Sequence, residues 1–384
     1  MSLFSPSRVL GALLLAASAV ANVHAQAYPA IPDAPNVDAR NYVLIDQDSH
    51  QILAARKADD RVPPASLTKL MTTYLTFQAL ALGRLKLDQQ IPVSVEAWKA
   101  GGSTMFLQPK LPVTVDQLIS GMVVVSGNDA ADALAQAIAG NTDSFVQMMN
   151  ATARQLGLSE SHFDNVNGLP TTTNLVSARD IGVLAEDIVQ RYPQYLHYFG
   201  EHTFTYNRIT QPNWNPLLFS DSSVTGMKTG HTDEAGYCLV ATAVRKGRPL
   251  IAVVLGSSTR KASAQAAEAL LDYGYLNFET HLAYKAGQVV DRLRNNWASP
   301  AEIPVGPAAD TWVTVPLGRY AALKPGLDVA ANMPLPLKRE QTIGQLTLSD
   351  GKQATVDIPL VALAPVARAG WLTHWWNELV ALTI

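Results

Sequence analysis

A serine followed three residues later by a lysine is the simplest pairing of a nucleophile and a base in this chain of 384 residues. Ser66 and Lys69 stand at the start of a segment with helical periodicity, where a three-residue step places both side chains on one face. A serine hydroxyl is a weak nucleophile that needs a base. Lysine can be that base only when neutral, and burial or a nearby positive charge lowers its pKa. The pattern alone is a weak signal, because Ser258 and Lys261 repeat it.

Two further short motifs carry polar side chains that could serve the same chemistry. Ser-Gly-Asn at 126–128 falls between two helical patterns, on a predicted loop that exposes the serine and the asparagine. A plain helix–loop–helix link capped by the asparagine is the alternative. Lys-Thr-Gly at 228–230 falls on a predicted strand. Glycine lets a ligand approach that strand closely, while the lysine charge and the threonine hydroxyl suit a substrate carboxylate.

The order and spacing of the motifs carry more weight than any one of them. Ser126 follows Ser66 by 60 residues, and Lys228 follows Ser126 by 102. The motifs fall in turn at a helix start, on a loop in a helical region and on a strand. The second Ser-Xaa-Xaa-Lys copy lies after the Lys-Thr-Gly motif and fits no such order. Only the first copy is therefore a candidate catalytic pair.

The residues around the motifs closely resemble the low-molecular-mass penicillin-binding proteins, which are serine-type D-Ala-D-Ala carboxypeptidases of the penicillin-binding protein 5 and 6 type. The matching segments are Pro-Ala-Ser-Leu-Thr-Lys at 64–69, Ser-Gly-Asn-Asp-Ala at 126–130 and Lys-Thr-Gly-His-Thr at 228–232. Gly-Leu at 168–169 and Ser-Ala-Arg-Asp at 177–180 add to the likeness, which extends from about residue 38 to the C-terminus.

The resemblance implies hydrolysis of the terminal D-Ala-D-Ala bond of peptidoglycan stem pentapeptides through a serine acyl-enzyme, with release of D-alanine. Peptidoglycan stem peptides and β-lactam antibiotics such as penicillin are the implied partners, and neither a metal nor another cofactor is implied. In this scheme Ser66 attacks the carbonyl between the two terminal D-alanines, Lys69 takes its proton, and Ser126 relays a proton to the departing D-alanine.

The resemblance also implies five substrate-binding residues. Asn128 would hold the acyl amide, and Lys228 would supply positive charge and support the proton relay. Thr229 would bind the terminal carboxylate, within the motif that Gly230 completes. The backbone N–H of His231 would form an oxyanion hole with that of the nucleophile. The sequence gives the His231 imidazole no evident acidic partner, so the ring is not expected to act as a base.

One position departs from the family pattern. Members often carry an arginine just before the helix that follows the last core strands, where it assists carboxylate binding, and the aligned residue here is Ser263. Arg260 and Lys261 lie close by in sequence, and either could compensate.

The elements that must position these residues follow from the hydrophobic pattern. A β-hairpin is predicted at 42–46 and 51–55, and a helix after the prolines at 63–64. Most of 116–190 is expected to be helical. Strands are predicted at 203–206, 226–230, 237–244 and 250–255, and a further helix at 264–278. After about residue 284, short runs broken by Pro, Gly and Asp-Gly predict a small all-β domain.

We therefore expect an α+β protein with the penicillin-binding/β-lactamase-like transpeptidase fold, in which an antiparallel sheet carries a helical subdomain. A small all-β domain and a C-terminal amphipathic helix should follow. The expected parts are a signal peptide at 1–25, a catalytic domain at 26–284, a β-rich domain at 285–367 and a membrane-anchor helix at 368–384.

The first 25 residues have the form of a secretory signal. Arg8 precedes an apolar run at 9–21, and a small-residue cleavage site ends at Ala25. An uncleaved anchor or a buried core helix is the alternative, although the run is short for a membrane span of about 20 residues. Export to the periplasmic face of the bacterial inner membrane is therefore expected.

Composition excludes other classes. The net charge of −3 argues against a nucleic-acid binder. The single cysteine, Cys238, excludes an intrachain disulfide and a multi-cysteine zinc site, and is expected to be a small buried hydrophobe.

The C-terminal segment has one continuous apolar helix face. Its members are Trp371, Leu372, Trp375, Trp376, Leu379 and Val380. Tryptophan rings favour the membrane headgroup layer, and a segment of about 15 residues is too short to span a bilayer. A peripheral membrane anchor is therefore predicted. A helix docked on the protein's own β domain is the alternative.

Other activities of the same fold stay open. A class A β-lactamase uses a glutamate with an asparagine four residues later to drive deacylation, whereas here Glu160 is followed by Asp164. A D,D-endopeptidase is a second alternative. A non-catalytic wall-binding protein is a third, disfavoured because all the motif side chains are present.

Overall fold

A five-stranded antiparallel sheet with the order β2-β1-β9-β8-β7 organises the first part of the chain. The computed structural model describes residues 31–329, 333–350 and 354–381, so the predicted signal peptide lies outside the described residues. The strands are β1 (Asn41–Asp46), β2 (Ile52–Arg56), β7 (Val224–Thr232), β8 (Gly236–Arg245) and β9 (Arg248–Ser257). Each overlaps a predicted strand, and the pairing of β1 with β2 confirms the predicted hairpin.

Helices and short 3₁₀ segments cover this sheet. The larger ones are η1 (Ala65–Thr68), α1 (Lys69–Ala81), α3 (Val115–Val124), α4 (Asn128–Ala139), α5 (Thr142–Gln155), α6 (Ala178–Arg191), η2 (Pro193–Gly200) and α8 (Arg260–Asn277). The smaller elements are β3 (Gln90–Ile91), α2 (Val95–Trp98), β4 (Val113–Thr114), β5 (Thr203–Tyr206), β6 (Ile209–Pro212) and α7 (Leu217–Ser220). Ser177 caps α6, since its hydroxyl accepts from the N–H of Asp180 at 3.0 Å.

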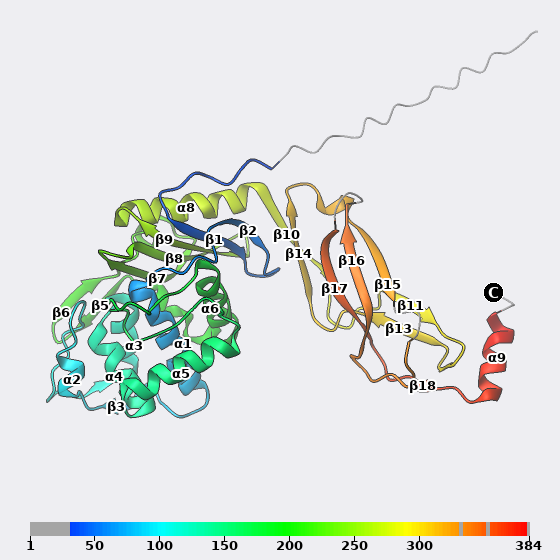
Figure 1. The fold of residues 1–384 in the computed structure, drawn as a ribbon, viewed down its shortest axis with the longest axis horizontal. Helices are drawn as coiled ribbons and strands as arrows, with labels where there is room; N and C mark the ends of the chain where they lie inside the picture. Colours follow the sequence, from blue (N-terminus) through cyan, green and yellow to red (C-terminus); the bar gives the residue numbers. More distant parts are fainter. Residues whose placement is uncertain (1–30, 330–332, 351–353, 382–384) are drawn as a thin grey trace, which may run out of the picture. The chain divides into compact units, whose positions relative to one another are not determined.

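Successive side chains of the sheet face opposite layers of helices, as the pleat requires. In β8, Leu239 and Ala241 share a buried cluster with side chains of α8. Cys238 and Val240, which alternate with them, belong to the larger core under the other helices. Figure 1 shows α8 on one side of the sheet and α1, α3 and α6 on the other. The motifs lie on the side of this larger core.

The chain after α8 forms β structure with its own core. Strand β10 (Phe278–Tyr284) pairs with β14 (Thr311–Pro316), and a second sheet has the order β11-β13-β17-β16-β15. The remaining elements are β11 (Asp291–Arg294), β12 (Ala298–Ser299), β13 (Glu302–Gly306), η3 (Tyr320–Ala322), β15 (Lys324–Val329), β16 (Thr342–Ser349), β17 (Ala354–Ala362) and β18 (Ala367–Arg368). Ile303, Leu346 and Leu360 are fully buried in this core. The expected α+β class with a later all-β part is confirmed.

Helix α9 (Trp371–Ala381) docks through its polar face. The ring of His374 stacks on Trp297 with centroids 3.6 Å apart. The side-chain amide of Asn377 donates to the carbonyls of Asn296 and Ala298 at 3.0 and 3.2 Å. These contacts agree with the alternative of a helix docked on the β domain, and they come from the polar face of α9.

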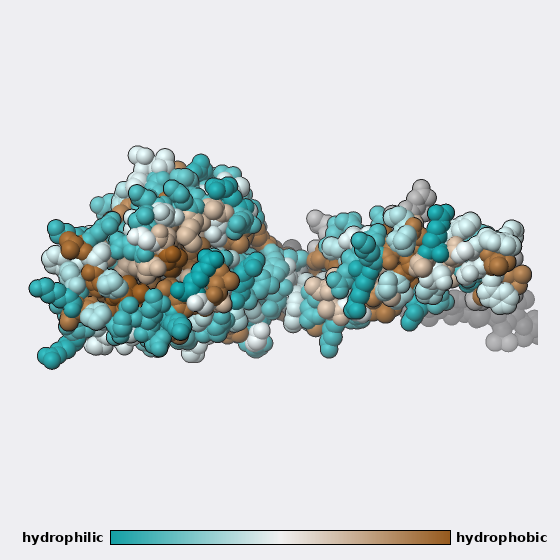
Figure 2. Space-filling model, turned by 90° about the horizontal axis from the view of Figure 1, so that it is seen from below, coloured by the Kyte–Doolittle hydropathy of each residue, from teal (hydrophilic) through white to brown (hydrophobic). Residues whose placement is uncertain are grey.

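The apolar side chains of α9 stay at the surface. Five of them are 60–69% exposed: Trp371, Leu372, Trp375, Trp376 and Leu379. Figure 2 shows apolar side chains at the end of the molecule that α9 occupies. Within the described ranges, no helix combines the length and the apolar character needed to cross a membrane.

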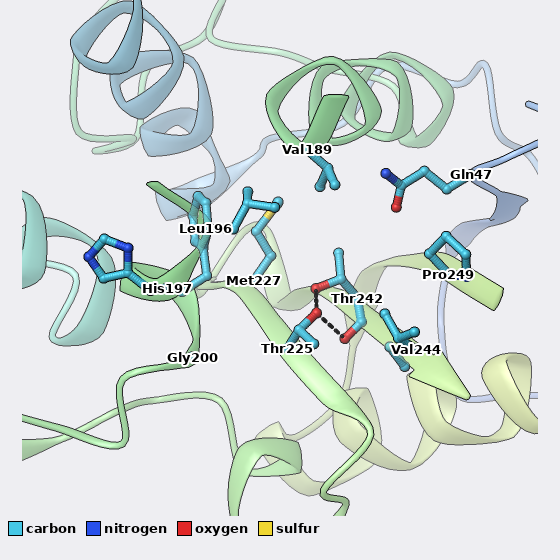
Figure 3. Close-up of a pocket in the computed structure, with 12 residues that line it drawn as sticks. Gln47, Val189, Leu196, His197, Gly200, Thr225, Met227, Thr242, Val244 and Pro249 are labelled. Carbon is cyan, nitrogen blue, oxygen red and sulfur yellow. Dashed lines mark hydrogen bonds between the residues drawn. The ribbon is translucent and has the colours of Figure 1, made fainter. Parts of the chain in front are cut away.

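The larger of two cavities near β7 lies away from the motifs. It has a volume of about 540 Å³ and is lined from β7, β8, η2 and α6. Figure 3 shows Val189, Leu196 and Met227 around it, with the hydroxyls of Thr225 and Thr242 bonded to each other at 2.8 Å. The described residues that line it include no serine, lysine or carboxylate. Among the described residues, this cavity therefore lacks the serine–lysine pairing that the motifs predict.

Candidate active site

The three motifs meet in a smaller cavity of about 230 Å³. Its lining residues are Ser66, Ser103, Ser126, Trp214, Thr229, Gly230, His231, Tyr237, Cys238, Arg260 and Ser263. Five of the eight residues predicted from sequence line this cavity directly. Lys69, Asn128 and Lys228 are buried behind its wall.

Ser66 and Lys69 are joined by a tight turn and not by a continuous α-helix. Ser66 lies within the 3₁₀ segment η1, and α1 begins at Lys69. The expected step of one helical turn is kept, because the Nζ atom of Lys69 lies 2.9 Å from Oγ of Ser66. The 3₁₀ segment turns the serine toward the cavity while the lysine continues into the buried helix.

The Lys69 amine has two further neighbours, and both can only accept. Its Nζ donates to Oδ1 of Asn128 and to the carbonyl of Asn167, each at 2.6 Å. A neutral amine has two N–H bonds and one lone pair, so these acceptors use its donors and leave the lone pair for the Ser66 hydroxyl. Lys69 is fully buried. Burial, followed by the charge of Lys228, lowers the pKa of Lys69 well below its ordinary value of 10.5.

The Ser-Gly-Asn-Asp motif holds a neighbouring loop against this amine. Asn128 is the first residue of α4 and makes no side-chain cap. Its Nδ2 donates to the carbonyl of Gly101, which turns Oδ1 toward Lys69. The next residue, Asp129, accepts from the N–H groups of Met105 and Leu107 at 3.0 and 3.1 Å. The motif therefore fixes residues 101–107 as well as the lysine.

Ser126 has an unusual backbone and an unpartnered hydroxyl. Its φ is 59°, in the left-handed region that non-glycine residues seldom adopt. The side chain is 5% exposed, and its Oγ has no hydrogen-bond partner among the described residues. An unpaired buried hydroxyl is costly in a folded protein. Backbone strain together with an unpaired polar atom is typical of a functional site.

Strand β7 closes the cavity opposite Ser66. A Cβ atom on Gly230 would lie 3.0 Å from the backbone nitrogen of Ser66, so glycine is needed for this close approach. Thr229 and His231 flank this glycine and line the cavity. The Nζ of Lys228 donates to the carbonyl of Thr229 at 2.9 Å. Burial lowers the pKa of Lys228 to about 7.

The His231 ring faces outward. It is exposed and stacks on Tyr237, with centroids 4.0 Å apart. None of the ion pairs between described residues involves it. Among the described residues the ring therefore has no acidic partner, as the sequence predicts.

Several residues of the site were not predicted. Asn167, whose carbonyl contacts Lys69, comes from a loop held by Gly168, where a Cβ would lie 1.9 Å from the carbonyl oxygen of Ala65. Gly168 was part of the family likeness, and a glycine at that place is the sequence signal that could have pointed to this loop, where its φ is 85°. Trp214 and Ser103 come from irregular segments that hydrophobic periodicity does not address.

Cys238 also lines the cavity, yet it is 2% exposed. Burial raises the pKa of its thiol to about 11. This confirms the prediction of a small buried hydrophobe.

Comparisons with known proteins agree with this geometry. A family model described as D-alanyl-D-alanine carboxypeptidase matches residues 28–259. A second model, described as the C-terminal domain of penicillin-binding protein 5, matches residues 278–368.

Individual relatives match over most of their length. The D-alanyl-D-alanine carboxypeptidase DacC of Escherichia coli is 36% identical over 353 residues, which cover 90% of this chain and 88% of the relative. The crystal structure of penicillin-binding protein 5 from Haemophilus influenzae superposes with a TM-score of 0.85 at 35% identity, covering 88% of this chain and 100% of that one. Penicillin-binding protein D2 from Listeria monocytogenes in its ampicillin-bound form gives a TM-score of 0.59 at 28% identity, covering 64% of this chain and 100% of that one. The chain therefore belongs to the D-alanyl-D-alanine carboxypeptidase family of serine peptidases.

Proposed function

We propose that this protein is a serine D,D-carboxypeptidase that removes the terminal D-alanine of peptidoglycan stem pentapeptides and is acylated by penicillin. The observation that carries the proposal is the environment of the Lys69 amine. Two acceptor oxygens occupy its N–H groups, and its third neighbour is Oγ of Ser66 at 2.9 Å. A buried neutral amine in this position is the base that a serine nucleophile needs.

In the acylation step, Ser66 Oγ attacks the carbonyl carbon of the penultimate D-alanine while its proton passes to Lys69. The negative charge that develops on the carbonyl oxygen is stabilised by the backbone N–H groups of Ser66 and His231. The close approach of β7 at Gly230 supports this pairing, since it brings the strand against the Ser66 turn.

Collapse of the tetrahedral intermediate breaks the C–N bond and expels the terminal D-alanine. Its amine needs a proton, and Ser126 supplies it by relay from the protonated Lys69. The buried Ser126 hydroxyl has no other partner among the described residues, which suits a donor held for a substrate atom. Lys228 adds positive charge nearby, Asn128 orients the acyl amide, and Thr229 binds the terminal carboxylate. Water then hydrolyses the ester and regenerates the serine.

The direct test is turnover of a D-Ala-D-Ala pentapeptide by the mature chain, followed as free D-alanine, beside labelling with a fluorescent penicillin. The proposal expects both. Labelling without any release of D-alanine would overturn the carboxypeptidase assignment and keep only β-lactam binding. Hydrolysis of the β-lactam faster than of the peptide would point to a β-lactamase instead.

We also propose that the protein is exported and attaches to the periplasmic face of the inner membrane through α9. The signal-like pattern at 1–25 supports export. The packing of α9 supports attachment, because its polar face is held by Trp297 and Asn296 while five large apolar side chains stay exposed. Fully burying each such side chain is worth roughly 1.5–3 kcal/mol, so partial burial in a bilayer surface gives several kcal/mol in total.

Deletion of residues 370–384 should release the protein from membranes without loss of activity on a soluble peptide. Because apolar burial dominates, attachment of the full chain should resist high salt and yield to detergent. The measurement is binding to phospholipid vesicles in low salt, high salt and detergent. Replacing Trp371, Trp375 and Trp376 by alanine should weaken binding at least tenfold, whereas Thr373→Ala, also exposed on α9, should not. Full-length protein that washes off with salt alone would contradict the anchor.

A further inference from the structure

One arginine stands at the mouth of the catalytic cavity without an assigned role. Arg260 is the first residue of α8 and lines the cavity together with Ser66, Ser126 and Thr229. It is exposed, and among the described residues its guanidinium takes part in no ion pair or hydrogen bond. The described residues that line the cavity include no aspartate or glutamate. A bound carboxylate would therefore meet this positive charge without a competing anion.

An aromatic ring holds the guanidinium in place. The Cζ atom of Arg260 lies 4.2 Å from the centroid of the Trp214 ring, a cation–π contact. The indole Nε1 of Trp214 donates to the carbonyl of Val125 at 3.2 Å. Val125 directly precedes Ser126, so the tryptophan is tied to the loop that carries the proposed proton donor. Stacking on the ring leaves the N–H groups at the guanidinium edge available to a ligand.

The two other candidates for this role are placed differently. Ser263 aligns with the arginine that many family members carry, but it is 3% exposed and its hydroxyl donates to the carbonyl of Arg260 at 2.9 Å. It therefore supports the first turn of α8. Lys261 borders a neighbouring cavity with Gln265 and Glu268 and does not line the catalytic one. Arg260 borders both cavities, and of the three it alone brings a charge to the catalytic cavity.

The two lysines of the site are less suited than Arg260 to bind a carboxylate. Lys69 must be neutral to act as a base, and burial lowers the pKa of Lys228 to about 7. An arginine keeps its charge throughout the physiological pH range. The planar guanidinium also matches the two oxygens of a carboxylate.

We propose that Arg260, held over the ring of Trp214, binds the C-terminal carboxylate of the substrate together with Thr229, in place of the arginine that family members often carry at the position of Ser263. Arg260 is thereby the residue that makes the enzyme specific for a free C-terminus. Trp214 is a positioning residue, since it acts through the guanidinium. This inference rests on the proposed function, because it names how that same site recognises its substrate.

The test compares ligands that differ only in the carboxylate. The peptide pair is a D-Ala-D-Ala peptide and its C-terminal amide, and the β-lactam pair is a penicillin and its methyl ester. Arg260→Gln should lower kcat/KM for the free-acid peptide by about 10- to 100-fold, mainly through KM, and leave the amide unchanged. It should likewise slow acylation by the penicillin and not by the ester. Arg260→Lys should restore part of the loss.

Lys261→Gln is the matched control and should leave all four ligands unaffected. Trp214→Ala should reduce the preference for the free acid by less than Arg260→Gln does. An equal loss with acid and amide in Arg260→Gln would mean a merely structural role and would overturn the inference, as would selective loss in Lys261→Gln. If the penicillin pair shows the Arg260 effect but no variant or wild-type protein releases D-alanine, the carboxypeptidase proposal fails and the carboxylate site stands.

Discussion

The sequence Ser-Xaa-Xaa-Lys occurs three times in this chain, at 66–69, 258–261 and 349–352, and the first two copies lie in opposite surroundings. In the first copy Lys69 is fully buried, and its Nζ contacts Ser66 Oγ and two further oxygens. In the second copy Ser258 and Lys261 are both exposed, and the Ser258 hydroxyl donates to the carboxylate of Asp38. One copy thus pairs a hydroxyl with an amine, and the other pairs a hydroxyl with an acid.

The elements around each copy explain the difference. The first copy spans a 3₁₀ segment that runs into a buried helix under β7. The second overlaps the exposed start of α8, where the hydroxyl of Thr259 caps the helix by accepting from the N–H of Ala262 at 3.0 Å. Spacing places a serine near a lysine in both cases. Burial and the acceptors around the amine decide whether the lysine can act as a base.

Replacing each of the two serines by alanine should give opposite results. Ser66→Ala should abolish labelling by penicillin and reduce release of D-alanine on the order of 10⁴-fold or more, because among the described residues the only hydroxyl bonded to the Lys69 amine is that of Ser66. Ser258→Ala should leave both unchanged. Fluorescent penicillin labelling and a D-alanine assay measure the effect, and circular dichroism checks that both variants fold. Covalent labelling of Ser66→Ala at wild-type rates would show that the nucleophile is elsewhere.

The sequence predicted which residues lie together in the site, but not the contacts that hold them there. The alternating and helical hydrophobic patterns of the chain were sufficient to predict the strands and the main helices. Together with the order of the motifs, they were also sufficient to predict the fold class. The contacts that tune Lys69 depend on the carbonyl of Asn167, 98 residues away, and on a loop that turns at Gly168 with a φ of 85°. Such contacts depend on backbone conformation in irregular segments, where periodicity carries no information.

The way in which α9 docks could also not be predicted from the sequence pattern. A helical wheel identifies the apolar face but cannot show that His374 stacks on Trp297 and leaves that face free. The boundaries of the domains and the roles of the individual site residues stay predictions.

The pH dependence of acylation should separate the role of Lys69 from that of Lys228. Lys69 acts when neutral, so kcat/KM should rise with pH and level off far below 10.5, since burial and Lys228 lower its pKa. Lys228 contributes when protonated, so the rate should fall again as pH rises through its pKa of about 7. Each limb changes the rate by up to tenfold per pH unit. Stopped-flow acylation by a chromogenic β-lactam measures the profile.

Two variants show which group causes the falling limb of the pH–rate profile. Lys228→Arg keeps its charge at alkaline pH, so the falling limb should move upward by more than one unit, whatever the cost in absolute rate. Lys261→Gln, in the second copy, should leave both limbs where they are. A falling limb that stays in place in Lys228→Arg would mean that another group causes it.

The smallest expected effect comes from a buried carboxylate near Lys69, that of Asp132. The carboxylate of Asp132 is 8% exposed and accepts from the side-chain amide of Asn167 at 3.1 Å, while the carbonyl of Asn167 accepts from Lys69. Burial raises the pKa of Asp132 to about 6, so its carboxylate is mostly ionised at neutral pH and loses its charge on acidification. Its negative charge stabilises protonated Lys69 and therefore raises the pKa of the amine.

Asp132→Asn removes that charge and keeps a side chain of the same shape. The pKa of Lys69 should fall further, so the rising limb should shift to lower pH by about half a unit. Below the midpoint this makes acylation about threefold faster, with no change on the plateau. Asp143→Asn, which removes an exposed carboxylate from the first turn of α5, should not move the limb. If Asp132 serves only to hold Asn167, the substitution will instead lower the rate by the same factor at every pH, because the amine is then displaced and its proton affinity is unchanged.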